Sequence, residues 1–141
     1  MTGEGISVLK TPIDLKQVKV PIFVTGALTD HLTPWKGCYR TTQMLSGEST
    51  FVLSYSGHIA SLVNPPGNPK AHYWTGGPPG NDPDEWLEKA ERHRGSWWEA
   101  WADWFDAYSG DQLTPPKTLG SALNPPLEPA PGRYVRARPP V

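Results

Sequence analysis

Two side chains that could exchange a proton follow the two apolar stretches of this sequence. The runs Val20–Val24 and Phe51–Leu53 are rich in β-branched and aromatic residues, which predicts two buried strands. Asp30 follows the first run, and His58 follows the second at the first position of a loop. A strand fixes the backbone while a loop lets an imidazole face a cleft, which suits a general base. The alternatives are an ordinary loop histidine and an aspartate that caps the amides of a turn.

The elements between these residues suggest how they come together. Pro34 opens a helix that ends at Ser46-Gly47, with Thr33 or its neighbour as the cap. The order is therefore strand, Asp, helix, strand, His, which matches the later part of an α/β-hydrolase triad whose nucleophile lies earlier in the chain. We expect Asp30 and His58 to meet across adjacent strand ends, although 28 residues separate them.

Several motifs extend this pattern through most of the chain. They include Thr29–Trp35, Phe51–Leu53, Ser56–Ile59, Asn64–Pro66, Tyr73–Thr75, Trp86–Leu87, Gly95–Trp98 and Glu128–Val135. In this order and spacing, the sequence resembles the C-terminal part of poly(3-hydroxyalkanoate) synthases from about Ile13 onward. The pattern is most similar to the class I type, which acts on short-chain hydroxyacyl-CoA.

The resemblance implies an α/β chain that forms the C-terminal part of an α/β-hydrolase-like fold. Two core strands with an intervening helix would be followed by two helices and a Pro-rich extended tail. It also implies a cysteine that attacks a 3-hydroxyacyl-CoA thioester and releases CoA while a polyester chain grows. His58 would deprotonate that cysteine, and Asp30 would orient the imidazolium or activate the substrate's 3-hydroxyl. No metal or organic cofactor is implied, because the CoA thioester is itself the substrate.

The single cysteine, Cys38, does not fit the role of the nucleophile. In the synthases that the sequence resembles, the nucleophilic cysteine stands in a G-x-C-x-G motif, which forms a sharp strand-to-helix turn. Cys38 lies between Asp30 and His58 and does not have a glycine at both of these flanking positions, so we expect it on the face of a helix. The sequence therefore predicts that the attacking cysteine belongs to polypeptide absent from this chain. We expect a piece of a synthase, from a truncated or split gene or from an internal start, that is inactive alone.

Composition limits the other functions. The chain has 141 residues and a net charge of −1, and it has no basic cluster before its last residues, which argues against nucleic-acid binding. Residues 1–10 contain no apolar run, so neither a signal peptide nor a transmembrane span is predicted. One cysteine suits a reducing compartment, and we expect a cytoplasmic protein. The resemblance adds the surface of polyester granules and a homodimer of the full-length synthase as partners.

The remaining sequence predicts a domain from residue 16 to 109, after a lead-in of residues 1–15. Ala71–Thr75 could add an edge strand, and one helix capped by Asp82 should end at Gly95. A second helix, capped by Ser96, carries aromatic residues at helical spacing that could form core, an interface or a polymer-contacting surface. Residues 110–141 are Pro-rich and predict either a disordered tail or an extended segment, docked through Tyr134-Val135.

Three further histidines and two rival functions complete the expectations. His31 is expected to point to solvent, and His72 and His93 are expected to be structural because no metal-ligand spacing supports them. One rival is the end of another α/β-hydrolase, such as a lipase or thioesterase. The other is a non-catalytic fragment that binds granules or a synthase through its tryptophan-rich helix.

Overall fold

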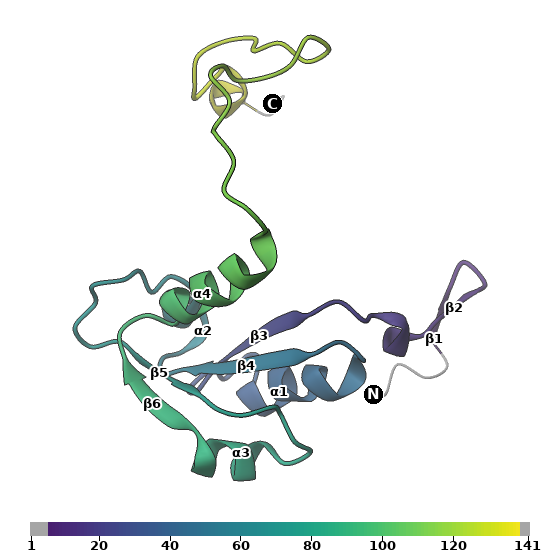
Figure 1. Cartoon of the computed structure of the whole chain (residues 1–141), viewed down its shortest axis with the longest axis vertical. Helices are drawn as coiled ribbons and strands as arrows, with labels where there is room; N and C mark the ends of the chain where they lie inside the picture. Colours follow the sequence, from purple (N-terminus) through teal and green to yellow (C-terminus); the bar gives the residue numbers. More distant parts are fainter. Residues whose placement is uncertain (1–5, 139–141) are drawn as a thin grey trace. The chain divides into compact units, whose positions relative to one another are not determined.

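The structure, a computed structural model, describes residues 6–138 (Figure 1). The chain divides after Ser109 into two compact units. The expectations for residues 1–5 and 139–141 lie outside the described residues. Within residues 6–138, no helix is both long enough and apolar enough to cross a membrane.

The first unit is built on a four-stranded sheet with the order β3-β4-β5-β6. Strands β3 (Ile22–Ala27) and β4 (Ser49–Ser54) run parallel, in a register that pairs their first and last residues, and α1 (Trp35–Met44) connects them. Strands β5 (His72–Thr75) and β6 (Glu91–Arg94) add antiparallel pairs. The predicted pair of strands with a helix between them is confirmed. Strand β3 begins at Ile22, however, so Val20 lies before it and is exposed, and only the last two residues of β3 are buried.

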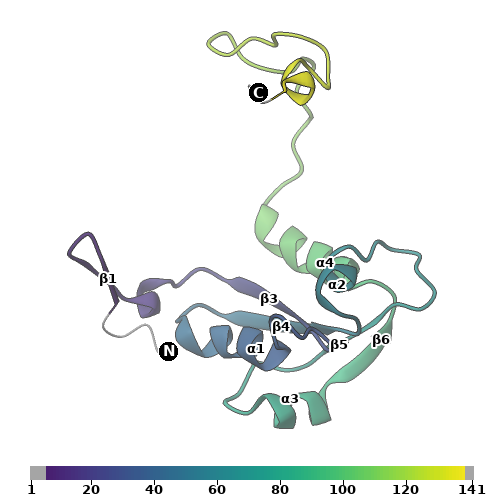
Figure 2. The same ribbon diagram turned by 180° about the vertical axis from the view of Figure 1, so that it is seen from behind.

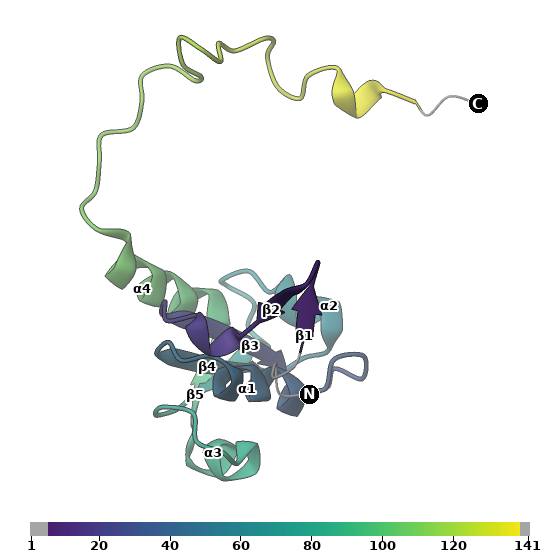
Figure 3. The ribbon, with the colours of Figure 1, turned by 90° about the vertical axis from the view of Figure 1, so that its right-hand side faces the viewer.

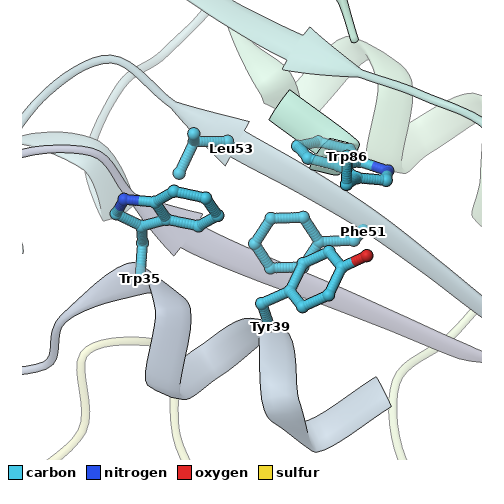
Figure 4. Packing of buried hydrophobic residues seen from close by; sticks show 5 residues of the cluster. All are labelled: Trp35, Tyr39, Phe51, Leu53 and Trp86. Carbon is cyan, nitrogen blue, oxygen red and sulfur yellow. The ribbon is translucent and has the colours of Figure 1, made fainter. Parts of the chain in front are cut away.

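An aromatic core fills the face of the sheet covered by α1 and by α3 (Pro83–Lys89) (Figure 4). Phe51 and Leu53 alternate along β4 and point to this face, as the two-residue period of a strand requires. The Phe51 ring meets those of Tyr39 and Trp86 edge-on, each at a centroid distance of 4.9 Å. Gly26 of β3 gives this cluster its space, because a Cβ there would come within 3.0 Å of Phe51 and Trp35.

Two helices lie on the other face, α2 (His58–Leu62) and α4 (Trp97–Ser109) (Figures 2 and 3). Phe23 of β3 contacts Trp97 and Trp104 of α4, with ring centroids 6.4 and 5.5 Å apart. Ser96 starts α4 as predicted, since its hydroxyl accepts the amide hydrogen of Trp98 at 3.1 Å. The same hydroxyl donates to the backbone oxygen of buried Asn64.

Several local expectations were wrong. The helix capped by Asp82 ends at Lys89 instead of Gly95, and the next residues form β6, which makes β5 an inner strand instead of an edge. Pairing with β5 overrides helical propensity here, because Tyr73 stacks on His93 at 5.2 Å and Arg92 lies over the Trp74 ring. Of the two residues offered as the cap of α1, Thr33 and its neighbour, it is the neighbour Pro34 that occupies the cap position, without a side-chain bond.

The parts before β3 and after α4 hold little regular structure. An unpredicted hairpin joins β1 (Ile6–Val8) to β2 (Thr11–Ile13), and the 3₁₀ turn η1 (Leu15–Gln17) follows. In the second unit, Arg133 contacts Glu128 at 3.2 Å, next to the 3₁₀ turn η2 (Tyr134–Arg136). Of the two alternatives for the tail, an extended segment at Tyr134-Val135 is not what forms there, because these residues lie in the turn η2.

Candidate active site

Asp30 lies in a tight turn directly after β3. Its Oδ1 accepts the backbone amides of Leu32 and Thr33 at 2.9 and 3.0 Å, and its Oδ2 accepts the Thr33 hydroxyl at 3.1 Å. This is the local hydrogen bonding that Asp favours in turns. Only 6% of the Asp30 side chain is exposed, so the turn both positions and shields the carboxylate.

These hydrogen bonds keep the carboxyl group ionised. The amide of Thr33 is the main cause that lowers the pKa of Asp30 well below its usual range, and the His58 ring adds to the shift. Partial burial acts in the opposite direction but is outweighed. Asp30 is therefore a fixed negative charge at neutral pH.

His58 reaches this charge from the end of the neighbouring strand. Its Nδ1 lies 2.8 Å from Asp30 Oδ2, so the predicted meeting of the two side chains is confirmed. The parallel register brings the two strand ends level, and the amide of Thr29 bonds to the carbonyl of Ser56 between the two loops at 3.3 Å. His58 is the first residue of α2, however, and not the loop residue that was expected.

The charge on Asp30 determines which nitrogen of His58 carries hydrogen. An ionised carboxylate can only accept, so Nδ1 must be the donor in this contact. The neutral ring then presents an unprotonated Nε2, which is the form needed for a general base. The His58 side chain is 42% exposed, so its other nitrogen is not sealed inside the chain.

A cavity of about 150 Å³ opens beside this pair. Its walls come from β3, α1, the end of β4, α2 and the start of α4: Thr25, Gly26, Ala27, Asp30, Thr33, Cys38, Ser54, His58, Ser61, Leu62 and Trp97. Cys38 lies on α1, as predicted, and is partly buried. Burial raises the pKa of its thiol, as does the charge of Asp30, so both effects oppose a thiolate.

Three polar residues of this cavity were not singled out from the sequence as parts of a site. Thr33 bonds Asp30, and its position three residues after an aspartate is a turn signal that could have indicated this. Ser54 and Ser61 are buried, and neither hydroxyl has a hydrogen-bond partner within the described part of the chain. Only the fold could reveal them, because serine at a strand end or in a short helix is common.

The other histidines lie away from this pair. His31 is exposed. His72 contacts the rings of Tyr55 and Trp74, and His93 Nε2 lies 2.7 Å from the Thr75 hydroxyl. Within residues 6–138, no group of three or more His, Cys, Asp or Glu side chains could hold a metal ion.

The parallel strands, the connecting helix and the acid–histidine pair at the strand ends define part of an α/β-hydrolase-like chain. No protein-family model matches the sequence. The chain is 48% identical over 134 residues to Poly(3-hydroxyalkanoate) polymerase 2 of Ectopseudomonas oleovorans, which covers 95% of this chain and 24% of that protein. It is 44% identical over 135 residues to polymerase 1 of the same organism, covering 96% of this chain and 24% of that protein.

A third relative is Poly(3-hydroxyalkanoate) polymerase subunit PhaC of Cupriavidus necator, 39% identical over 133 residues, which are 94% of this chain and 23% of that protein. The chain spans about a quarter of the length of these curated relatives. It is thus homologous to a segment of the poly(3-hydroxyalkanoate) polymerases, as the motifs of the sequence predicted.

Proposed function

We propose that this chain supplies the histidine and its acid to a poly(3-hydroxyalkanoate) polymerase, as the C-terminal part of its catalytic domain. The observation that carries the proposal is the 2.8 Å contact between His58 Nδ1 and the ionised Asp30. The identity to named polymerases over almost the whole chain supports the substrate class. The nucleophile comes from polypeptide outside these 141 residues.

In the proposed reaction, Nε2 of His58 takes the proton of an incoming cysteine thiol. The thiolate attacks the carbonyl of a 3-hydroxyacyl-CoA thioester, and the tetrahedral intermediate collapses with loss of the CoA thiolate. The imidazolium returns its proton to that sulfur, so free CoA leaves. His58 then removes the proton of the 3-hydroxyl of the next substrate, and that oxygen attacks the acyl-cysteine. The new ester bond lengthens the polyester as the carbon–sulfur bond breaks, and the cysteine thiolate takes the proton back from His58.

Asp30 acts on the imidazole in this scheme and not on the substrate hydroxyl. Its carboxylate accepts two amides, one hydroxyl and the His58 ring, so it has a strongly lowered pKa and is a weak base. The negative charge of this carboxylate, 2.8 Å from His58 Nδ1, stabilises the imidazolium that forms in each half-reaction. The structure thus favours the first of the two roles that the sequence left open.

The cellular setting belongs to the same proposal. The substrates are 3-hydroxyacyl-CoA and a growing polyester, and the work takes place in the cytoplasm at the surface of polyester granules. The exposed aromatic side chains of α4, including Trp101 and Phe105, supply an apolar surface for such a granule or for a second polymerase. A chain that bound granules but contributed nothing to turnover would be the alternative.

The test uses a chimera in which this chain replaces the matched segment of polymerase 2 from Ectopseudomonas oleovorans. CoA release from 3-hydroxyacyl-CoA is measured for the chimera and its variants. We expect His58→Ala and Asp30→Asn each to slow release by about 10²–10⁴-fold, because the first removes the general base and the second removes the charge that orients the imidazole and stabilises its protonated form. The control is His31→Ala, an exposed neighbour of Asp30, which should leave the rate unchanged. Normal turnover in His58→Ala would refute the proposal.

A further inference from the structure

The side chain of Thr33 lies against both members of the acid–histidine pair. Its hydroxyl oxygen is 3.1 Å from Asp30 Oδ2 and 3.4 Å from His58 Nδ1. Nδ1 itself lies 2.8 Å from the same Oδ2, so the three atoms form a closed triangle. The proposed reaction uses Asp30 and His58 but leaves the third corner of the triangle, the Thr33 hydroxyl, without a role.

The ionisation of Asp30 determines how the hydrogens of this triangle point. An ionised carboxylate can only accept, so the Thr33 hydroxyl donates to Oδ2, as does Nδ1–H of His58. The Thr33 amide is the main cause that lowers the pKa of Asp30, and the Thr33 hydroxyl adds to this shift. The donation leaves the lone pairs of the threonine oxygen to face Nδ1. An imidazole that swings away from Oδ2 therefore meets a second acceptor on this side.

The hydroxyl holds the carboxylate oxygen that the backbone amides of the turn do not bond. The amides of Leu32 and Thr33 both donate to Oδ1 of Asp30. The torsion that turns an aspartate carboxylate has a broad minimum, so contacts on one oxygen leave the plane of the group soft. A donor on Oδ2 fixes this plane, and with it the direction in which Oδ2 accepts the His58 ring.

The chain holds Thr33 itself in a rigid position. Pro34 follows it, and a residue before proline is confined to extended backbone. Threonine is branched at Cβ, which restricts the rotamers of its side chain. Trp35, two residues later, is 8% exposed and packs in the aromatic core, so this end of the turn is anchored. The hydroxyl is thus in place before a substrate binds, which is what a preorganised site requires.

We propose that Thr33 is a positioning residue of the acid–histidine pair. Its hydroxyl keeps Oδ2 of Asp30 in line with Nδ1–H of His58, and the imidazole so held directs Nε2 at the thiol and then at the 3-hydroxyl. Thr33 acts through the pair and not on the substrate. This inference deepens the proposed function and rests on it.

The Thr33→Val variant of the polymerase 2 chimera removes the hydroxyl and keeps the shape of the side chain and the backbone amide. We expect kcat for CoA release to fall about tenfold at unchanged KM, because a carboxylate that is not held in line stabilises the imidazolium less well. Thr33→Ser, which restores a hydroxyl, should recover most of kcat. The matched control is Thr29→Val, since Thr29 is exposed in the same loop and lies outside the triangle. An unchanged kcat in Thr33→Val would overturn the inference.

A double-mutant cycle shows whether Thr33 acts through Asp30. The Asp30→Asn chimera has no charged acceptor, so adding Thr33→Val to it should slow CoA release by less than about twofold further. A purely structural role of Thr33 predicts the same loss with and without Asp30→Asn, because independent effects add. Equal losses in the two backgrounds would therefore contradict the positioning role. Should Thr33→Val fail to fold, Thr33→Ala replaces it in both experiments with the same expected outcomes.

The outcomes also separate this inference from the proposed function. Normal turnover in the His58→Ala chimera would refute the proposed function, whatever the Thr33 variants do. Loss of turnover in His58→Ala and Asp30→Asn, with a normal kcat in Thr33→Val, would refute the role of Thr33 and leave that of the pair intact.

Discussion

The two faces of the sheet are buried to different degrees. On the face of α1 and α3, the aromatic cluster of Trp35, Tyr39, Phe51 and Trp86 is buried. On the other face, α4 has no buried residue, although it is thirteen residues long and rich in tryptophan. The acid–histidine pair and the cavity lie at the carboxyl ends of the strands, where the cavity reaches α2 and α4. Stability therefore resides mainly on one face, while the face of α4 offers surface to other polypeptide.

The largest expected effect on the free energy of unfolding is the difference between two phenylalanine-to-alanine substitutions, one on each face of the sheet. Phe51 is 2% exposed and Phe105 is 54% exposed. We expect Phe51→Ala to lower the free energy of unfolding by about 3–5 kcal/mol, because it leaves a cavity in the core. Phe105→Ala should change it by less than about 0.5 kcal/mol, as is usual at exposed sites. Urea unfolding measures both, and similar losses would show that the α4 face is as closed as the other.

A smaller effect should appear in the dependence of stability on pH. The pKa of Asp30 is lower in the folded chain than the unfolded value of about 4, so its contribution is present above that value. This contribution is lost as the pH falls below 4 toward the folded pKa. The Asp30→Asn variant should therefore lose less stability than the unchanged chain between pH 4 and pH 2.

Urea unfolding at each pH measures that difference. Asp14→Asn is the comparison variant, because it removes an exposed carboxylate whose pKa is also lowered, by the side chain of Gln17 and the amide of Lys16, and should likewise reduce the loss of stability in acid. An acid slope that is the same for the Asp30→Asn variant and the unchanged chain would mean that the turn around Asp30 is not formed.

The smallest expected effect on stability is a slight gain instead of a loss. Ser54 and Ser61 carry buried hydroxyls with no partner within residues 6–138. Replacing either by alanine removes a desolvated polar group, so the free energy of unfolding should stay equal or rise by about 1 kcal/mol. A loss of stability in both variants, measured by thermal unfolding, would mean that these hydroxyls are satisfied by ordered water.

The parts of the fold that follow local chemistry could be predicted from the sequence. The apolar runs gave the two parallel strands, Asp82 and Ser96 gave the helix starts, and the strand order placed Asp30 beside His58. The parts that depend on distant partners could not be predicted. Glu91–Arg94 has a sequence suited to a helix end, and only pairing with β5 makes it a strand.

The candidate site shows the same division. The sequence identified the acid and the base, but not Thr33, which binds the acid through both its amide and its hydroxyl. It assigned His58 to a loop, because five residues are too few to give a readable helical period. The buried hydroxyls of Ser54 and Ser61 have no sequence signature at all, since their burial depends on how the strands and helices around the cavity pack together.

The short helix that carries His58 is tied down at its far end by two indoles. Trp97 Nε1 donates to the carbonyl of Ser61 at 2.6 Å, and Trp98 Nε1 donates to that of Leu62 at 3.0 Å. A five-residue helix has no internal partners for its last carbonyls, so these bonds stand in for the missing next turn. The orientation of the imidazole thus depends on two rings almost forty positions later in the chain. Phenylalanine at both positions would preserve the apolar contact yet leave the base on an unanchored turn.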